Sequence, residues 1–224
     1  MPKQQPTRAA GPNPGQNLTE SSKSARTRQR ILDAAAKVLN RNGYAGTRLS
    51  DIAELAQVQA PALYYYFASR EELIEEVVTV GMARALTHVT DALDELPPQA
   101  SKLDRISAAV GAHLEVVLRL SDYASAAIRY GPQLPADMRE RQLAEQRAYG
   151  EVWRDLVDEA MRSGELNPAL DSRAARMLVL GGLNWATEWW NPERHSLHTV
   201  ISTAQLLARQ GLAAPADPAT PKPT

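Results

Sequence analysis

The chain has 224 residues, of which 44% are hydrophobic, enough for one domain or two small ones around a buried core. It contains no cysteine, which excludes a disulfide framework and a thiolate zinc site. No apolar run is long enough to cross a membrane and the N-terminus lacks the pattern of a signal peptide, so we expect a cytoplasmic protein.

The net charge of −1 hides a division along the chain. Residues 1–70 contain ten Lys and Arg against four Asp and Glu, a net charge of +6, whereas residues 71–224 contain fifteen against twenty-two, a net charge of −7. A basic N-terminal part joined to an acidic remainder is typical of a protein that binds DNA at one end. A chance excess of arginine on a solvated helix is the alternative.

Residues 1–24 are rich in proline, glycine, glutamine and serine and are expected to form a disordered tail. A first helix is predicted over 26–42, because apolar residues recur there on one helical face. That face consists of Ile31, Leu32, Ala35, Val38 and Leu39. Gly43 then provides a C-cap.

Two short helices follow the first. Thr47 is a good N-cap for a helix that ends just before Val58. The next helix is predicted over Gln59–Phe67, with Pro61 in its first turn, where the missing N–H is not required. Two short helices joined by about three residues form a helix-turn-helix, whose second helix enters the major groove of DNA.

The second of these helices contains three consecutive tyrosines, which one buried stripe cannot cover. Leu63 and Phe67 lie four positions apart and can anchor one face of the helix. Tyr64 and Tyr65 therefore point elsewhere, with hydroxyls available as hydrogen-bond donors. We expect Tyr66 and Phe67 to belong to the core.

Several short segments carry a more specific signal, and their order and spacing matter as much as their composition. They are Ile31-Leu32-Asp33-Ala34-Ala35, Gly43-Tyr44, Thr47, Asp51-Ile52-Ala53, Leu63-Tyr64-Tyr65-Tyr66-Phe67 and Ser69-Arg70-Glu71-Glu72-Leu73. Together they closely resemble the DNA-binding domain of TetR-family transcriptional regulators, over residues 26–86 without a gap. One departure is Gln57, which stands in the inter-helix turn where the family usually has glycine; a left-handed conformation there would cost about 1 kcal/mol.

The resemblance implies roles in DNA binding. Thr47, Tyr64, Tyr65 and Arg70 would contact the phosphate backbone, and Arg48 lies at a helix start where phosphates bind well. Base contacts would fall to Gln59, Ala60, Pro61 and Ala62. Glutamine pairs best with adenine, and the other three residues offer apolar contacts to thymine methyl groups.

The remainder of the chain is also helical in pattern. Ser69 and Glu72 form a capping box that begins a helix over 70–93, and Leu96-Pro97-Pro98-Gln99 breaks the pattern after it. Further helices are predicted over 102–120, 123–130, 136–163, 171–190 and 196–210. The predicted fold is all-α with about nine helices: a tail at 1–24, a three-helix helix-turn-helix head at 25–87, a ligand-binding and dimerisation body at 88–212, and a tail at 213–224.

One head contacts too few base pairs for useful specificity, so a homodimer on a palindromic operator is expected. In the family the last two helices pair with their symmetry mates. The matching apolar residues here are Leu178, Gly181, Gly182, Trp185 and Trp189 in one helix, and Leu197, Val200, Ile201, Ala204 and Leu207 in the other. A buried core stripe is the alternative interpretation.

The body is rich in large aromatic residues, which often line ligand pockets but more often fill cores. The candidates for an effector site are Tyr123, Tyr130, Trp153, Trp185 and Trp189. Asn184-Trp185, Glu188-Trp189-Trp190 and Pro192 also resemble a signature of TetR-type repressors that respond to acyl-CoA thioesters in fatty-acid or sterol catabolism. An effector of this kind would release the repressor from DNA by a population shift.

Three other functions remain open. A regulator of the same fold that senses cationic drugs would need a buried carboxylate, for which Glu188 is the candidate. A small helical enzyme is disfavoured because the chain has no glycine-rich phosphate loop and no nucleophile motif, and His195 and His198 have no third metal ligand nearby. A purely structural helical dimer would leave the basic head unexplained. We expect no catalytic residues, no metal site and no cofactor.

Overall fold

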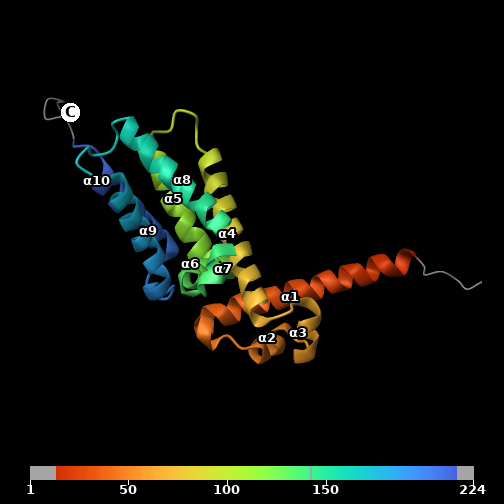
Figure 1. The fold of residues 1–224 in the computed structure, drawn as a ribbon. Coiled ribbons are helices and arrows are strands. Elements are labelled where there is room, and N and C mark those ends of the chain that lie inside the picture. Colours follow the sequence, from red (N-terminus) through yellow and green to blue (C-terminus); the bar gives the residue numbers. More distant parts are fainter. Residues whose placement is uncertain (1–13, 142, 216–224) are drawn as a thin grey trace, which may run out of the picture.

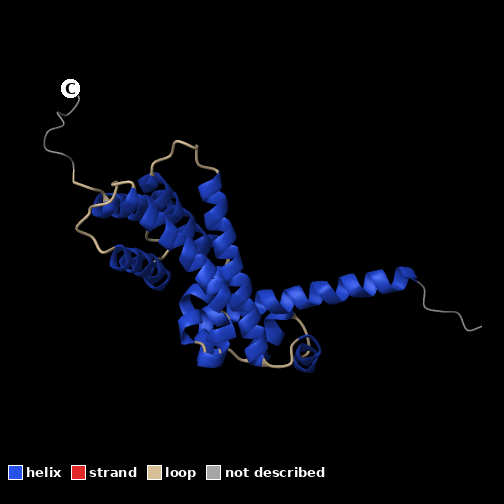
Figure 2. Ribbon diagram, turned by 45° about the horizontal axis from the view of Figure 1, so that its top comes forward, coloured by secondary structure: helices blue, strands red, loops and turns tan. Residues whose placement is uncertain are grey.

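The computed structural model describes residues 14–141 and 143–215, and this part of the chain is built from α-helices without β-strands (Figure 1, Figure 2). The head contains α1 (Pro14–Gly46), α2 (Leu49–Ala56), α3 (Ala60–Tyr66) and the first turns of α4 (Arg70–Asp94). The body contains the rest of α4 and α5 (Lys102–Glu115), α6 (Asp122–Tyr130), α7 (Ala136–Arg141), α8 (Leu143–Arg162), α9 (Ser172–Trp189) and α10 (Leu197–Leu212). The all-α prediction, with a helix-turn-helix head and a helical body, is confirmed.

Helix α1 is much longer than the sequence pattern predicts. It begins at Pro14 and projects away from the head (Figure 1). The expected disordered tail is therefore wrong for residues 14–24, while residues 1–13 lie outside the described part of the chain. Pro14 is tolerated in a first helical turn, and no proline or glycine interrupts residues 16–42, so the helix can propagate. Gly43, with φ +70°, breaks the helical geometry where the sequence predicts a C-cap.

Helix α4 runs from the head through the full height of the body (Figure 1). Ser69 caps it by accepting a hydrogen bond from the Glu72 N–H at 3.0 Å. The predicted capping box is incomplete, because the Glu72 carboxylate accepts from the N–H of Ala68 at 2.6 Å rather than from Ser69. Gly81 lies halfway along α4 at its closest approach to α6, which packs across α1 and α4 at the base of the body.

The body departs from the predicted helices at two places. The helix predicted over 102–120 is α-helical to Glu115 and then widens to a π-helix, Val116–Leu120. The helix predicted over 136–163 is described as α7 and α8 on either side of residue 142, which lies outside the described residues. Asp171 and Ser196 cap α9 and α10 as predicted, each accepting a backbone N–H three residues further along the chain.

Residues 213 and 214 have structure that the sequence pattern does not predict. An isolated antiparallel bridge joins Ala213 to Leu166, and the Ala214 N–H donates to the Glu165 carbonyl at 2.8 Å. These contacts order residues 213 and 214, which the sequence pattern assigns to a disordered tail; residues 216–224 lie outside the described part. Among the described helices, none combines the length and the apolar character needed to cross a membrane.

Candidate DNA-binding surface and effector site

Helix α3 presents a mixed face to solvent, as the sequence predicts. Leu63 and Phe67 are buried and anchor the helix, whereas Tyr64 and Tyr65 are 61% and 80% exposed. Tyr66 is half-buried, and its ring meets that of Tyr65 edge to face at 5.1 Å. The hydroxyls of the two outer tyrosines are thus free to reach a partner outside the head.

The residues predicted to contact bases lie at the start of α3. Gln59, Ala60 and Pro61 are exposed, and Ala62 is half-buried. Gln59 is the N-cap residue, and its side chain makes no capping hydrogen bond. Its amide therefore remains available for an external acceptor or donor. Arg48, the N-cap of α2, is exposed on the same head.

The turn between α2 and α3 has the conformation that the family's glycine would favour. Gln57 has φ 54° and ψ 48°, in the left-handed region. Its N–H donates to Glu54 O at 3.1 Å, and the N–H of Val58 donates to Ala53 O at 3.0 Å. These two bonds form a Schellman motif, so the turn keeps its geometry despite the strain of a non-glycine residue.

Thr47 does not have the role that the sequence suggests. The prediction that it caps α2 is wrong, since Arg48 is the N-cap residue and Thr47 is 2% exposed. Its hydroxyl donates to the Gly43 carbonyl at 2.7 Å, where the broken end of α1 leaves that oxygen unpaired. Because the hydroxyl is buried and already bonded, we do not retain it as a phosphate contact.

Arg70 holds the head together from the start of α4. Its Nε donates to the Thr47 carbonyl at 2.7 Å, one Nη donates to the Tyr44 carbonyl, and the other lies 2.8 Å from the Glu71 carboxylate. The guanidinium also stacks on the Tyr44 ring at 4.6 Å. Each of its nitrogens thus has a partner inside the protein, so Arg70 positions the α1–α2 junction, and its predicted phosphate contact would have to use the second N–H of an Nη nitrogen.

The five aromatic residues predicted to line an effector site do not converge. Tyr123 and Tyr130, both on α6, are buried against the head. The Tyr123 hydroxyl donates to Asp33 at 2.8 Å and the Tyr130 hydroxyl donates to the Asn40 carbonyl at 3.1 Å, both on α1. Burial and the hydrogen bond to Asp33 raise the pKa of Tyr123, so it remains a neutral donor. These two tyrosines join head to body.

The three tryptophans of that set also lie apart. Trp153 is fully buried in α8, while Trp185 and Trp189 are 64% and 49% exposed on α9. Trp153 packs against His113 of α5 and Tyr149 of α8, with ring centroids 6.0 and 6.5 Å away. The Trp residues of α9 belong instead to an apolar surface that continues onto α10, formed by Met177, Leu178, Trp185, Trp189, Leu206 and Leu207.

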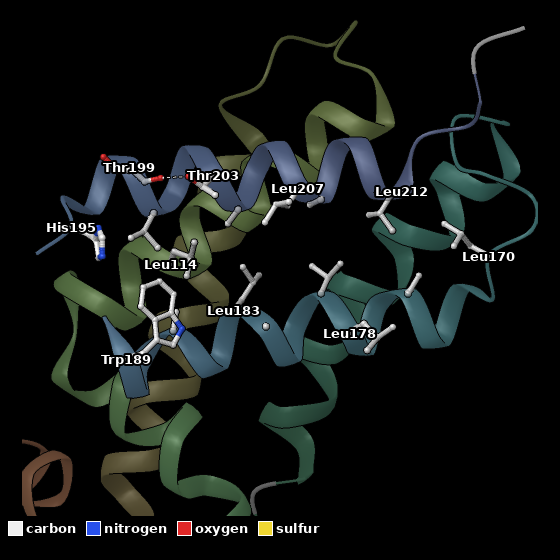
Figure 3. Close-up of a pocket in the computed structure, with 18 residues that line it drawn as sticks. Leu114, Leu170, Leu178, Leu183, Trp189, His195, Thr199, Thr203, Leu207 and Leu212 are labelled. Carbon is white, nitrogen blue, oxygen red and sulfur yellow. Dashed lines mark hydrogen bonds between the residues drawn. The ribbon is translucent and has the colours of Figure 1, made fainter. Parts of the chain in front are cut away.

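A cavity of about 640 Å³ lies between α9 and α10 (Figure 3). Leu178, Leu183 and Trp189 of α9 face Thr203, Leu207 and Leu212 of α10 across it, and Leu114 of α5 forms part of its wall. The lining is mainly apolar, and its outer residues belong to the exposed surface described above. The volume is in the range of small-molecule sites.

The alternative of a cation sensor loses its candidate residue. Glu188 is paired with Arg129 of α6, whose Nη2 donates to it at 3.0 Å, and this hydrogen bond lowers the pKa of Glu188. It is therefore not a free buried carboxylate for a cationic drug. Among the described residues, no cluster of three or more His, Asp or Glu could hold a metal ion. Arg129 also lies 3.5 Å from the Asn40 carbonyl of α1, so it contacts both the head and α9.

Sequence reasoning missed a buried polar cluster in the body. His113 is fully buried, and its Nδ1 lies 2.6 Å from the Tyr149 hydroxyl. A signal was present, since His113 continues the apolar stripe of Ile106, Ala109 and Val110 at helical spacing and so had to face the core. Burial lowers the pKa of His113 to about 4, and the side-chain amide of Asn184 on α9 lies close enough to oppose this shift, although the two groups do not meet the geometry of a hydrogen bond.

Comparison with known proteins agrees with this architecture. Residues 31–77 match the family described as "Bacterial regulatory proteins, tetR family", and residues 99–212 match "Tetracyclin repressor-like, C-terminal domain". The chain is 22% identical over 184 residues to the fatty acid metabolism regulator protein of Bacillus subtilis, covering 81% of this chain and 93% of that protein. It is 26% identical over 176 residues to the transcriptional repressor KstR2 of Mycolicibacterium smegmatis, covering 76% and 82%.

Among solved structures, AibR in complex with isovaleryl coenzyme A and operator DNA superposes with a TM-score of 0.72 at 20% identity, over 82% of this chain and 98% of that one. This likeness concerns the fold. The two family matches together span both the head and the body, and both describe DNA-binding regulators rather than enzymes. The chain therefore belongs to the TetR family of transcriptional regulators.

Proposed function

We propose that this protein is a transcriptional repressor that binds a palindromic operator in the cytoplasm as a homodimer and leaves it when an acyl-CoA thioester binds to the body. The observation that carries the DNA-binding part is the exposed face of α3. There Gln59, Tyr64 and Tyr65 project from a helix whose opposite side is anchored by buried Leu63 and Phe67. A helix held in this way can enter a major groove without losing its packing.

The proposed dimer forms through α9 and α10. In the family the last two helices pair with their symmetry mates, and here they carry the apolar surface defined above, from Met177 to Leu207. Contiguous exposed apolar surface of this kind is typical of an interaction site. A second copy seated there would also cover the open side of the cavity between the two helices.

The acyl-CoA effector is supported by the relatives and by the apolar lining of the body. AibR, of the same fold, binds isovaleryl coenzyme A together with operator DNA, and a relative in Bacillus subtilis regulates fatty acid metabolism. The proposed route from effector to DNA passes through α6. Tyr123 and Tyr130 hold α6 to α1, and Arg129 ties it to Glu188 of α9, so a displacement of α9 reaches the head.

The test is binding of the purified protein to its own upstream DNA, titrated in salt, with and without a panel of acyl-CoA thioesters. Arg48→Ala should weaken binding to all sequences and reduce the salt slope by about one, while Gln59→Ala should reduce preference for the operator. Arg173→Ala, an exposed arginine in the first turn of α9, is the matched control. Binding that no thioester disturbs would refute the effector class, and absence of specific binding would refute the repressor.

A further inference from the structure

Besides Nε of Arg105, the described part of the body contains three polar atoms that are buried without a hydrogen-bond partner within the protein. They are Nε2 of His113 on α5, Nε1 of Trp153 on α8 and Oδ1 of Asn184 on α9. Leaving such atoms unpaired costs about 1–3 kcal/mol each, so a group from outside the chain, a bound water or a ligand, is expected to pair with them. His113 and Trp153 are 0% and 1% exposed, and their rings meet edge to face at 6.0 Å.

The protonation of the cluster follows from its contacts. Nδ1 of His113 and the Tyr149 hydroxyl share a hydrogen bond of 2.6 Å, and we assign the phenol, which burial keeps protonated, as its donor. With this assignment, the single proton of the His113 ring, which its low pKa keeps neutral, lies on Nε2. The unpaired set therefore consists of two N–H donors, from His113 and Trp153, and one acceptor, the Asn184 carbonyl.

We propose that His113, Trp153 and Asn184 form the site that recognises a single uncharged oxygen on the acyl part of the effector. A hydroxyl oxygen matches the set completely, because it accepts two hydrogen bonds and donates one. A ketone oxygen can accept from His113 and Trp153 but leaves Asn184 unpaired. A phosphate or carboxylate does not fit, since the cluster is neutral and offers no cation. The proposal rests on the acyl-CoA function proposed above, and it specifies that the protein recognises an oxygen on the acyl part of the effector.

The surroundings of the cluster support a ligand site. The residues next to His113 and Asn184 in the chain, Leu114 and Leu183, line the 640 Å³ cavity between α9 and α10. The same turns of α5 and α9 thus supply both the polar cluster and one wall of the cavity. Helix α5 also widens into the π-helix Val116–Leu120 three residues after His113, a distortion that is frequent at functional sites.

The position of Asn184 links this site to the head. It lies one helical turn before Glu188, which pairs with Arg129, and Arg129 in turn approaches the Asn40 carbonyl of α1. An oxygen that draws Asn184 toward His113 and Trp153 would act on α9 next to this contact. Helix α9 would therefore both contact the effector and transmit its binding to the head.

The experiment compares three thioesters of equal chain length by calorimetric titration of the full chain: decanoyl-CoA, β-ketodecanoyl-CoA and β-hydroxydecanoyl-CoA. Wild-type protein should bind the hydroxy compound most tightly and decanoyl-CoA least, with about fivefold for each hydrogen bond gained. Trp153→Phe should weaken the hydroxy and keto compounds about fivefold and leave decanoyl-CoA unchanged. Asn184→Leu should abolish the preference for hydroxy over keto, and it keeps the test decisive if Trp153→Phe does not fold.

Trp190→Phe is the matched control, because the Trp190 N–H already donates to the His195 carbonyl at 3.0 Å. It should keep the wild-type order of affinities. Equal binding of the three thioesters by the wild type, or an unchanged preference in both test variants, would overturn this inference while leaving the acyl-CoA function intact. Failure of all three to bind or to release operator DNA would overturn the effector class itself, and this inference with it.

Discussion

The contact between α4 and α6 makes a sharp prediction for Gly81→Ala. A Cβ at Gly81 would lie 2.1 Å from the Tyr123 carbonyl oxygen, 2.6 Å from its carbon and 2.8 Å from the Ala127 Cβ. The first two neighbours are backbone atoms and cannot rotate away, so α4 and α6 must separate by about 1 Å, which a close-packed interior resists. Helix propensity alone would favour alanine by about 1 kcal/mol.

The two effects have opposite signs, and their magnitudes decide between them. Overpacking a core costs about 1–3 kcal/mol, and contact with rigid backbone places Gly81→Ala at the upper end. The expected result is a net loss of about 2 kcal/mol in the free energy of unfolding, or roughly 4–8 °C in Tm for a chain of this size. Thermal unfolding followed by the helical circular dichroism signal measures it directly.

Gly150→Ala in α8 provides the matched control. A Cβ at Gly150 meets no atom within 4 Å, so propensity acts there without a clash. This variant should gain about 1 kcal/mol, or about 2–4 °C in Tm. The reasoning fails if Gly81→Ala is as stable as the wild type or rises with the control. In that case α4 and α6 would not be in close contact, and α6 could not couple the body to the head as proposed.

Three further predictions follow from other parts of the chain. Gln57→Gly should raise the unfolding free energy by about 0.5–1 kcal/mol, as denaturant titration would measure, whereas Gln57→Ala should not, because it retains the Cβ in the left-handed turn. Stability should fall as the pH is lowered from 6.5 to about 4, because His113 binds a proton in the unfolded state but not when it is buried in the folded protein. The free energy of unfolding should fall by about 3 kcal/mol over this range, and its dependence on pH should be weaker in His113→Leu. Leu207→Glu, 68% exposed on α10, should weaken the dimer at least about tenfold in sedimentation equilibrium, while Leu120→Glu, 57% exposed on the π-helix, should not.

The head could be predicted from the sequence to a large extent because its constraints are local. The spacing of Leu63 and Phe67 determines which tyrosines face outward, and the chain length between α2 and α3 forces the left-handed turn at Gln57. The role of Thr47 could not be predicted from its neighbours in the sequence. Its residue type suits an N-cap, but its hydroxyl is bonded across the kink to Gly43, a contact that depends on how α1 ends.

The effector site could not be predicted because it depends on which helices meet. Aromatic composition placed Tyr123, Tyr130, Trp153, Trp185 and Trp189 in one candidate set, yet the fold assigns them to the head contact, the core and the exposed surface of α9. Sequence spacing within a helix indicates which residues share a face, but it does not indicate which helix lies opposite. His113, Trp153 and Asn184 come from three helices, and His113 approaches the other two only in the packed body.

The three unpaired groups of that cluster can supply about the free energy that an effector needs to release the protein from its operator. To weaken operator binding 100-fold, an effector must favour the released state by about 2.7 kcal/mol. Each hydrogen bond to an uncharged group contributes about 1 kcal/mol net. Two contacts, as a ketone would make, supply about 2 kcal/mol, whereas the three of a hydroxyl supply about 3 kcal/mol and reach the threshold. An apolar chain that filled the cavity equally well in both states would shift the equilibrium little, since tight binding without differential affinity moves no population. The polar cluster, rather than the apolar cavity, is therefore the part of the body suited to decide which thioesters release the repressor.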